Sequence, residues 1–403
     1  ASGNSSIATG TNATASGIAS IALGKYANTV GNNSLAIGQN STAIGNRVSA
    51  IGAYSTAIKN SSTALGFSAN ASGNRAHAIG SYSNSTGNAT LAVGYQSQAL
   101  DNRTTAIGGF ATANGNASTV LGHNASSSGL GAIAIGTLAA STGDRSISMG
   151  YQAKASNKNT IAIGYQSNAS GQNSTSVGTF STANGNWSSA YGTSSIASGE
   201  SAIAFGAGSV SSGSGSIVLG ANAIGNANNV VAIGTESEAS ATNAIAVGIG
   251  AKASKTNTTA VGTLAIASGE YSSSYGTLAN ASGNGSMAFG AGSNASGFDS
   301  ISFGVNSIAK NPNAVVFGTE ARALAEDATA VGYGAQATAI DSTALGKAAL
   351  ANKANAIALG SDAKAINVDA LAIGDAASAS GIASQASGKG ATASGNYSQA
   401  SGY

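Results

Sequence analysis

Residues 21–52 read IALGKYANTVGNNSLAIGQNSTAIGNRVSAIG, and this stretch decides the fold. Glycine recurs in it at positions 24, 38 and 52, and every fourteenth residue from Gly10 to Gly402 is again glycine, without an insertion or a deletion. A fixed period that runs through a chain is the signature of a repeat architecture. The 14-residue unit, called a coil below, is therefore the building block of the protein.

Two short segments of each coil alternate with a period of two, which is typical of β-strands. In the first segment a small residue lies between two apolar columns, as in the LAI sequence of residues 35–37. The residue before the glycine is large and apolar throughout, except for Thr9, Ser387 and Ser401 at the chain ends. In the second segment small residues flank a variable and mostly polar one, as in the STA sequence of residues 41–43.

A turn signal follows each segment. The second turn begins seven residues after the first, with glycine in many coils but with Lys59, Asp101 or Asn157 in others. Fourteen residues leave no room for a crossover helix, so each strand must pair in parallel with its equivalent one coil away. The prediction is an all-β parallel β-roll, a solenoid of 14-residue coils that runs as one continuous array of about 28 coils over residues 1–403. The predicted structural turn glycines of the first coils are Gly24, Gly38, Gly52, Gly66, Gly80 and Gly94.

A roll of two short strands has little interior, so a further surface has to be buried against other copies of the chain. The first strand has two faces, one aliphatic and one of alanine and serine. We expect the aliphatic face to line the interior and the alanine face to meet the partner chains, because alanine permits close approach of two backbones. The sequence leaves the opposite assignment open.

Composition excludes several classes of function. Charged residues make up 7% of the chain, against roughly 25% in ordinary soluble domains, and the formal net charge is +2. The 16 Lys and Arg are scattered without a basic run, so we expect no nucleic-acid binding. The absence of cysteine excludes a disulfide framework. No apolar run approaches the roughly 20 residues that span a bilayer, so this segment is expected to make no membrane contact.

Nothing in the sequence indicates an enzyme, which needs polar groups that converge in a pocket. The two histidines, His77 in an apolar column and His123 in a turn, are best explained as structural residues. Glycine-rich stretches such as residues 206–208 lack the following helix of a phosphate loop. We predict no catalytic residue, no cofactor and no metal site.

The motif Asn-Ser-x-Ala-Ile-Gly stands at residues 33–38, and a looser copy stands at residues 173–178. In this motif and its spacing the chain resembles the YadA-like head domains of trimeric autotransporter adhesins. The resemblance implies a left-handed β-roll, assembly as a homotrimer, and display on the surface of a Gram-negative bacterium. Neck, stalk and membrane anchor have no counterpart in the 403 residues, so an anchor in the outer membrane would lie outside them.

The resemblance also implies adhesion to extracellular-matrix proteins such as collagen, fibronectin or laminin, or to abiotic surfaces. Repetition favours such a role, because many weak contacts add through avidity. The alternative is a passive spacer that projects a binding domain located elsewhere on the fibre. Residues 177–248 resemble residues 261–332, and this duplication suits either role. An ice-binding array is disfavoured because its threonine column is broken.

Aromatic residues at outward or turn positions are the predicted adhesive contacts, because exposed aromatics are enriched at binding hot spots. The competing interpretation is that they cover neighbouring turns or the seams between chains. The predicted adhesive surface consists of Tyr95, Tyr151, Tyr165, Trp187 and Tyr271, with Phe110 and Phe180 as further candidates.

Overall fold

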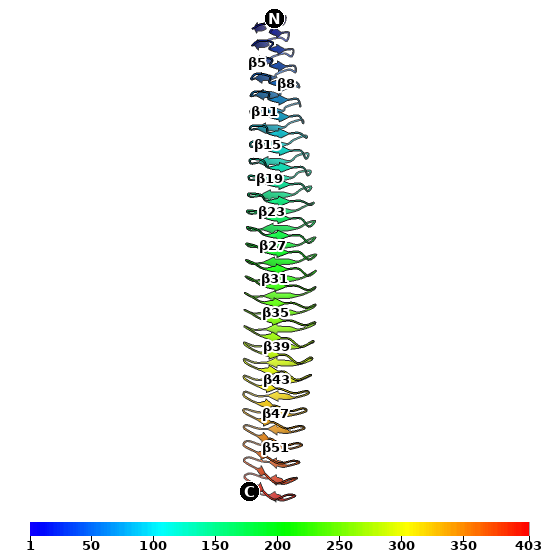
Figure 1. The fold of residues 1–403 in the computed structure, drawn as a ribbon, viewed down its shortest axis with the longest axis vertical. Helices are drawn as coiled ribbons and strands as arrows, with labels where there is room; N and C mark the ends of the chain where they lie inside the picture. The colour runs from blue at the N-terminus through cyan, green and yellow to red at the C-terminus, as the bar shows by residue number, and fades with distance from the viewer. Residues whose placement is uncertain (403) are drawn as a thin grey trace. The chain divides into compact units, whose positions relative to one another are not determined.

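The computed structural model describes residues 1–402, which form strands and turns and contain no helix. The chain divides into two compact units, Ala1–Ser201 and Ala202–Tyr403, called the N-terminal and the C-terminal unit below. Both are built in the same way. In each coil a three-residue strand, a turn, a two-residue strand and a second turn follow one another (Figure 1).

The strand bounds repeat every 14 residues. The odd-numbered strands have three residues each and run from β1 (Ile7–Thr9) to β27 (Ser189–Tyr191) in the N-terminal unit, and from β29 (Ile203–Phe205) to β57 (Gln399–Ser401) in the C-terminal unit. The even-numbered strands have two residues each and run from β2 (Thr14–Ala15) to β28 (Ile196–Ala197), and from β30 (Val210–Ser211) to β56 (Thr392–Ala393).

Within each unit, equivalent strands of neighbouring coils pair in parallel. β3 (Ile21–Leu23) pairs with β5 (Leu35–Ile37), and Ile21 faces Leu35, 14 positions further on. The odd-numbered strands form one sheet, called sheet A, and the even-numbered strands form a second, called sheet B. The predicted all-β parallel β-solenoid is therefore confirmed. The chain divides into two compact units. The continuity of the array over residues 1–403 therefore stays a prediction.

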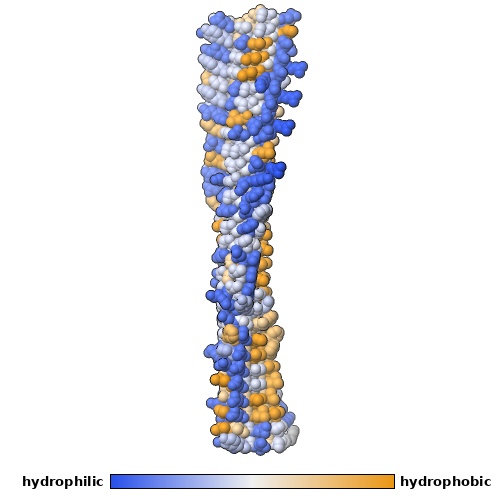
Figure 2. Space-filling view, turned by 90° about the vertical axis from the view of Figure 1, so that its right-hand side faces the viewer, coloured by the Kyte–Doolittle hydropathy of each residue, from blue (hydrophilic) through white to orange (hydrophobic). Residues whose placement is uncertain are grey.

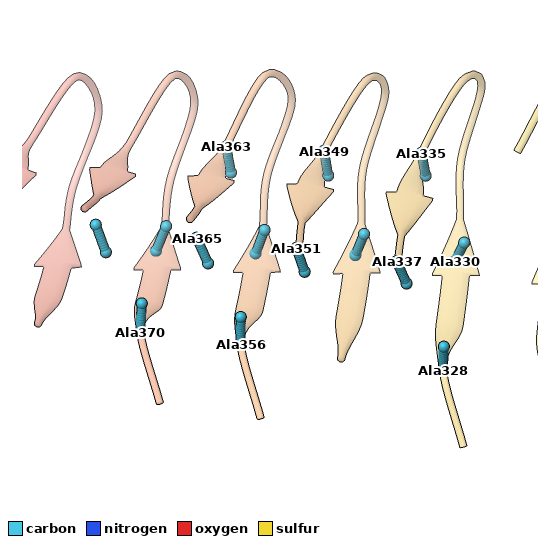
Figure 3. Packing of buried hydrophobic residues seen from close by; sticks show 14 of the residues in the cluster. Ala328, Ala330, Ala335, Ala337, Ala349, Ala351, Ala356, Ala363, Ala365 and Ala370 are labelled. Atoms are coloured by element: carbon cyan, nitrogen blue, oxygen red, sulfur yellow. The ribbon is translucent and has the colours of Figure 1, made fainter. Parts of the chain in front are cut away.

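The interior lies between the two sheets and contains only small side chains. In the second coil, Ser20, Ala22, Ala27 and Thr29 are fully buried, whereas both neighbours of Ala22 on β3 are partly exposed. Valine is the largest side chain that is fully buried anywhere in residues 1–402. Figure 3 shows the same arrangement in the C-terminal unit, where alanine methyl groups from both sheets fill the space between them.

The expectation that the aliphatic columns line the interior is therefore wrong. The alanine and serine face of sheet A is inside, and the aliphatic face is outside. The physical reason is volume: side chains from both sheets share one thin layer, and close-packed interiors do not accept extra methylene groups without strain. Leucine and isoleucine are too large for this layer, so they occupy the outer face.

The two turns of a coil are called corners. The first corner begins with the invariant glycine, such as Gly80, whose φ is +129°. A Cβ atom on Gly80 would lie 2.5 Å from the carbonyl oxygen of Gly94, so a side chain is excluded both by conformation and by contact. The hydroxyl of Ser83, three residues on, donates a hydrogen bond of 2.8 Å to the carbonyl of Gly80 and closes the turn.

The second corner follows the two-residue strand and has the same outline. In both corners the third residue is left-handed, as in Tyr82 (φ 59°) at a first corner and Arg75 (φ 54°) at a second corner. Backbone hydrogen bonds continue from coil to coil through the corners: the Tyr82 N–H donates to the Phe67 carbonyl at 2.8 Å. The corners therefore form ordered edges along which side chains are stacked at a regular interval.

Candidate functional site

The outer face of sheet A consists of the first and third residues of the odd-numbered strands. The third residues form an apolar column, for example Leu65 of β9 (Thr63–Leu65), which is 43% exposed, and the first residues are aliphatic in some coils and Thr or Ser in others. Orange patches in Figure 2 show apolar residues gathered into stripes on the surface of each unit. Contiguous apolar surfaces of this kind mark interaction sites in soluble proteins. This surface, the aliphatic face, is the first candidate for contact with another molecule.

The first corners of the N-terminal unit carry a second surface, a row of rings that we call the aromatic ladder. Neighbouring rings make edge-to-face contacts, with centroid distances from 5.3 Å for Phe67 and Tyr82 to 6.0 Å for Tyr82 and Tyr95. Such contacts contribute about 0.5–1.5 kcal/mol each beyond the buried area, so each ring is supported by its neighbours in the row. The aromatic ladder consists of Tyr54, Phe67, Tyr82, Tyr95, Phe110 and His123.

The aromatic ladder is open to solvent, and no acidic residue, lysine or arginine stands beside it in the first corners. Its five Tyr and Phe side chains are between 42% and 48% exposed. Between Gly38 and Ser194, neither of the two residues that follow an invariant glycine is Asp, Glu, Lys or Arg. Rigid aromatic rings without competing charges supply contact area at little loss of side-chain entropy on binding. The ladder is therefore suited to contact with apolar or amphipathic ligands.

Two shorter rows of rings occur elsewhere. Tyr151 and Tyr165 stack at 5.2 Å, and Phe180 makes an edge contact of 5.3 Å with Tyr165, all at first corners of the N-terminal unit. In the C-terminal unit a row of stacked and tilted rings lies on the aliphatic face and not at a corner. It consists of Tyr275, Phe289, Phe303 and Phe317.

The structure brings some of the predicted contact residues together and separates others. Tyr95 lies within the aromatic ladder, and Tyr151 and Tyr165 form a stacked pair. Trp187 and Tyr271, which are 53% and 66% exposed, are left-handed residues of second corners in different units, away from these rows. The adhesive role of all five residues stays a prediction.

Sequence reasoning missed most of the aromatic ladder. Tyr54, Phe67 and Tyr82 were not singled out, and His123 was interpreted as an isolated structural residue, although its ring lies 5.6 Å from that of Phe110. The signal is present in the spacing. Successive members are alternately 13 and 15 residues apart, because they alternate between the two positions after the glycine.

Within residues 1–402, no three His, Cys, Asp or Glu residues are grouped so that they could hold a metal ion. The same part of the chain contains no helix of the length and apolarity needed to cross a membrane.

Comparison with known proteins finds a matching family and similar solved structures. The crystal structure of the collagen-binding domain of the Yersinia adhesin YadA is 22% identical, covering 41% of this chain and 69% of that one with a TM-score of 0.21. No curated protein matches the chain. The family model described as the YadA head domain repeat matches residues 1–27, 30–55, 57–83, 85–111, 113–139, 141–167, 155–181, 169–195, 197–223, 211–237, 226–251, 239–265, 267–293, 295–321, 309–335, 323–349, 337–363 and 386–403.

Proposed function

Because this chain belongs to the family of YadA head domain repeats, we propose that it is an adhesin head displayed on the surface of a Gram-negative bacterium. The parallel solenoid suits this role, since each coil repeats the same corners and presents the same kind of contact many times. Repetition of weak contacts raises the overall affinity through effective concentration. Anchorage in the outer membrane is part of the proposal and follows from the family resemblance.

Assembly as a homotrimer of left-handed rolls belongs to the same proposal. The exposed aliphatic face supports it, because the third residue of nearly every odd-numbered strand is a large apolar side chain that is half-buried or exposed in the single chain. Burial of apolar surface stabilises association by about 25 cal/mol per Å². Three copies that meet through this face leave the corners free for other partners.

The observation that carries the adhesive role is the aromatic ladder. It is exposed, its rings contact one another, and it lies at a corner, outside the aliphatic face. Extracellular-matrix proteins such as collagen, fibronectin and laminin are the proposed partners, with abiotic surfaces as a further target. A row of rings along an edge suits extended ligands of this kind, because one ligand molecule can contact several neighbouring rings at the same time.

The test is solid-phase binding of the assembled protein to immobilised matrix proteins. We expect the triple variant Tyr54→Ser, Tyr82→Ser, Phe110→Ser to lose at least about tenfold in apparent affinity, since aromatic anchors typically contribute 1 kcal/mol or more each. Serine is compatible with the backbone at this position, because Ser68 and Ser194 occupy it with the same left-handed φ in other coils.

The matched control is Leu138→Ser, Leu264→Ser, Leu278→Ser. These leucines occupy the same left-handed position at first corners, but they lie outside the aromatic ladder. Binding of the control variant is expected to equal that of the unmodified protein. If the ladder variant also binds normally, the ladder has no adhesive role. If the unmodified protein binds none of the matrix proteins, it acts as a passive spacer.

A further inference from the structure

Between Asn32 and Asn116, the second corners of the N-terminal unit bring four basic residues onto one edge, although they are far apart in the sequence. Arg47, Arg75 and Arg103 are each 28 residues apart, or two coils, which corresponds to about 10 Å at roughly 4.8 Å per coil. Lys59 begins the corner between those of Arg47 and Arg75. All four side chains are exposed. This surface is called the basic edge.

The basic edge has no acidic partners. Within residues 1–402 the ion pairs are Lys252–Glu238 and Lys389–Asp375, both in the C-terminal unit. Residues 1–100 contain no Asp or Glu, and Asp101 caps its own turn by accepting a hydrogen bond of 2.7 Å from the backbone of Asn102. The N-terminal unit as a whole has eight Lys and Arg against three Asp and Glu. The charge of the edge is therefore available to an external anion.

Asparagines between the basic residues present hydrogen-bond donors. The Oδ1 atom of Asn46 accepts from the Asn32 backbone at 2.9 Å, and that of Asn60 accepts from the Asn46 backbone at 2.9 Å. Asn88 and Asn102 are held in the same way, at 3.2 and 2.9 Å. Because each Oδ1 is occupied by its own backbone contact, the Nδ2 groups remain free to donate. The edge thus offers amide and guanidinium N–H groups and few acceptors.

The three arginines and these asparagines line three shallow grooves, which share residues and follow one another along the edge. The grooves extend from Asn32 to Asn116, six coils, which is about 29 Å at roughly 4.8 Å per coil. An isolated small anion would occupy only a fraction of this length. The length and the regular interval between the arginines suit an extended polymer with recurring anionic groups.

The arginines are not required by the turn itself. Arg47, Arg75 and Arg103 have φ between 54° and 58°, a left-handed conformation that is unfavourable for large side chains and that asparagine adopts more readily. Asn33 and Asn173 fill the same position in other coils. A recurring arginine at a position that favours asparagine indicates that its charge is used.

We propose that the basic edge binds a linear, sulfated or carboxylated polysaccharide. Planar guanidinium groups bind oxyanions through two parallel hydrogen bonds, and the asparagine amides add donors for sugar hydroxyls. Single-stranded nucleic acid fits less well, because the second corners between Asn32 and Ala117 contain no aromatic residue on which bases stack. This surface is separate from the aromatic ladder, which lies at the other corner.

A second copy of the chain is the other conceivable partner, because second corners of the C-terminal unit carry Asp299, Asp327, Asp341 and Asp369. Two of these carboxylates already accept hydrogen bonds within the unit. Asp327 accepts from Asn313 at 3.0 Å, and Asp369 accepts from Asn355 at 2.8 Å. These two carboxylates therefore already have hydrogen-bond partners within their own chain. This favours the polysaccharide over a second copy of the chain as the partner of the basic edge.

The experiment measures binding of the whole chain to immobilised heparin, with uncharged dextran and single-stranded DNA as comparison surfaces. The test variant is Arg47→Asn, Arg75→Asn, Arg103→Asn. Asparagine suits the left-handed conformation of this position in the turn, so the change removes the charge without straining the backbone. The control variant, Lys25→Asn, Lys154→Asn, Lys158→Asn, removes the same charge from the same unit outside the grooves. Thermal unfolding of both variants verifies that the fold is unchanged.

We expect heparin binding by the unmodified chain, a loss of at least about tenfold in the arginine variant and less than about twofold in the lysine control. Binding should weaken as NaCl rises from about 0.05 to about 0.5 M, because salt screens exposed charges. The proposal would be overturned if the chain did not bind heparin, if it bound DNA as tightly as heparin, or if both variants lost heparin affinity equally. It would also be overturned if the arginine variant kept its heparin affinity and lost only self-association, measured by sedimentation.

Discussion

At the scale of single residues, the conformation of the first corner explains the glycine column. Gly332 has φ +126°, and a Cβ atom there would lie 2.5 Å from the Gly346 carbonyl oxygen. Two residues later in the same turn, Gly334 has φ +63°, and a Cβ atom would meet nothing within 4 Å. Both positions have a left-handed backbone conformation, but only at the first does the neighbouring coil leave no space for a side chain.

This difference gives a prediction within one turn. Gly332→Ala should lower the free energy of unfolding by about 1–3 kcal/mol or more, because it adds backbone strain and a contact with the next coil. Gly334→Ala should change the free energy of unfolding by less than about 1 kcal/mol, as Ala348 and Ala376 occupy the same position with φ 52° and 55°. Urea unfolding of the two variants measures both values, and equal destabilisation would contradict this account of the column.

At the scale of the element, the width of the roll decides which face of a strand is inside. β47 (Thr329–Val331) places Ala330 in the interior, fully buried, and its two neighbours on the outer face. Ala330→Leu adds volume to a layer filled by methyl groups and should destabilise the protein by about 1–3 kcal/mol.

The matched control for Ala330→Leu is Thr329→Leu on the same strand. Leu35, Leu91 and Leu371 occupy the equivalent outer position in other coils, so this change should alter stability by no more than about 0.5 kcal/mol. Comparison of the two urea midpoints tests the face assignment. A more severe effect at Thr329 than at Ala330 would place the aliphatic face inside after all.

The period of the sequence was sufficient to predict the strands, the corners and the parallel pairing, because a strict repeat leaves few ways to stack. Which face is inside could not be predicted from hydrophobicity, since Ala36 and its neighbours Leu35 and Ile37 are all apolar. Side-chain volume decides that question. The basic edge was missed because Arg47 and Arg75 are distant in the chain and meet only when aligned on the period.

At the scale of the whole molecule, the aliphatic face is apolar surface that a single chain leaves exposed. In the C-terminal unit it includes the neighbouring rings of Phe289, Phe303 and Phe317, and the latter two are 50% and 44% exposed. Burial of a phenylalanine side chain contributes about 1.5–3 kcal/mol. Contact between copies through this face therefore depends strongly on these three residues.

The triple variant Phe289→Thr, Phe303→Thr, Phe317→Thr should lower the assembled mass in sedimentation towards that of one chain. The roll itself should persist, because the interior residues Ala288, Ser302 and Val316 are unchanged. The control Ile266→Thr, Ile308→Thr, Val210→Thr removes outward apolar residues of sheet B in the same unit and should leave the mass unaltered. The opposite result, in which the phenylalanine variant keeps its mass and the sheet B variant dissociates, would show that the copies meet through sheet B. The aliphatic face would then remain exposed in the assembly.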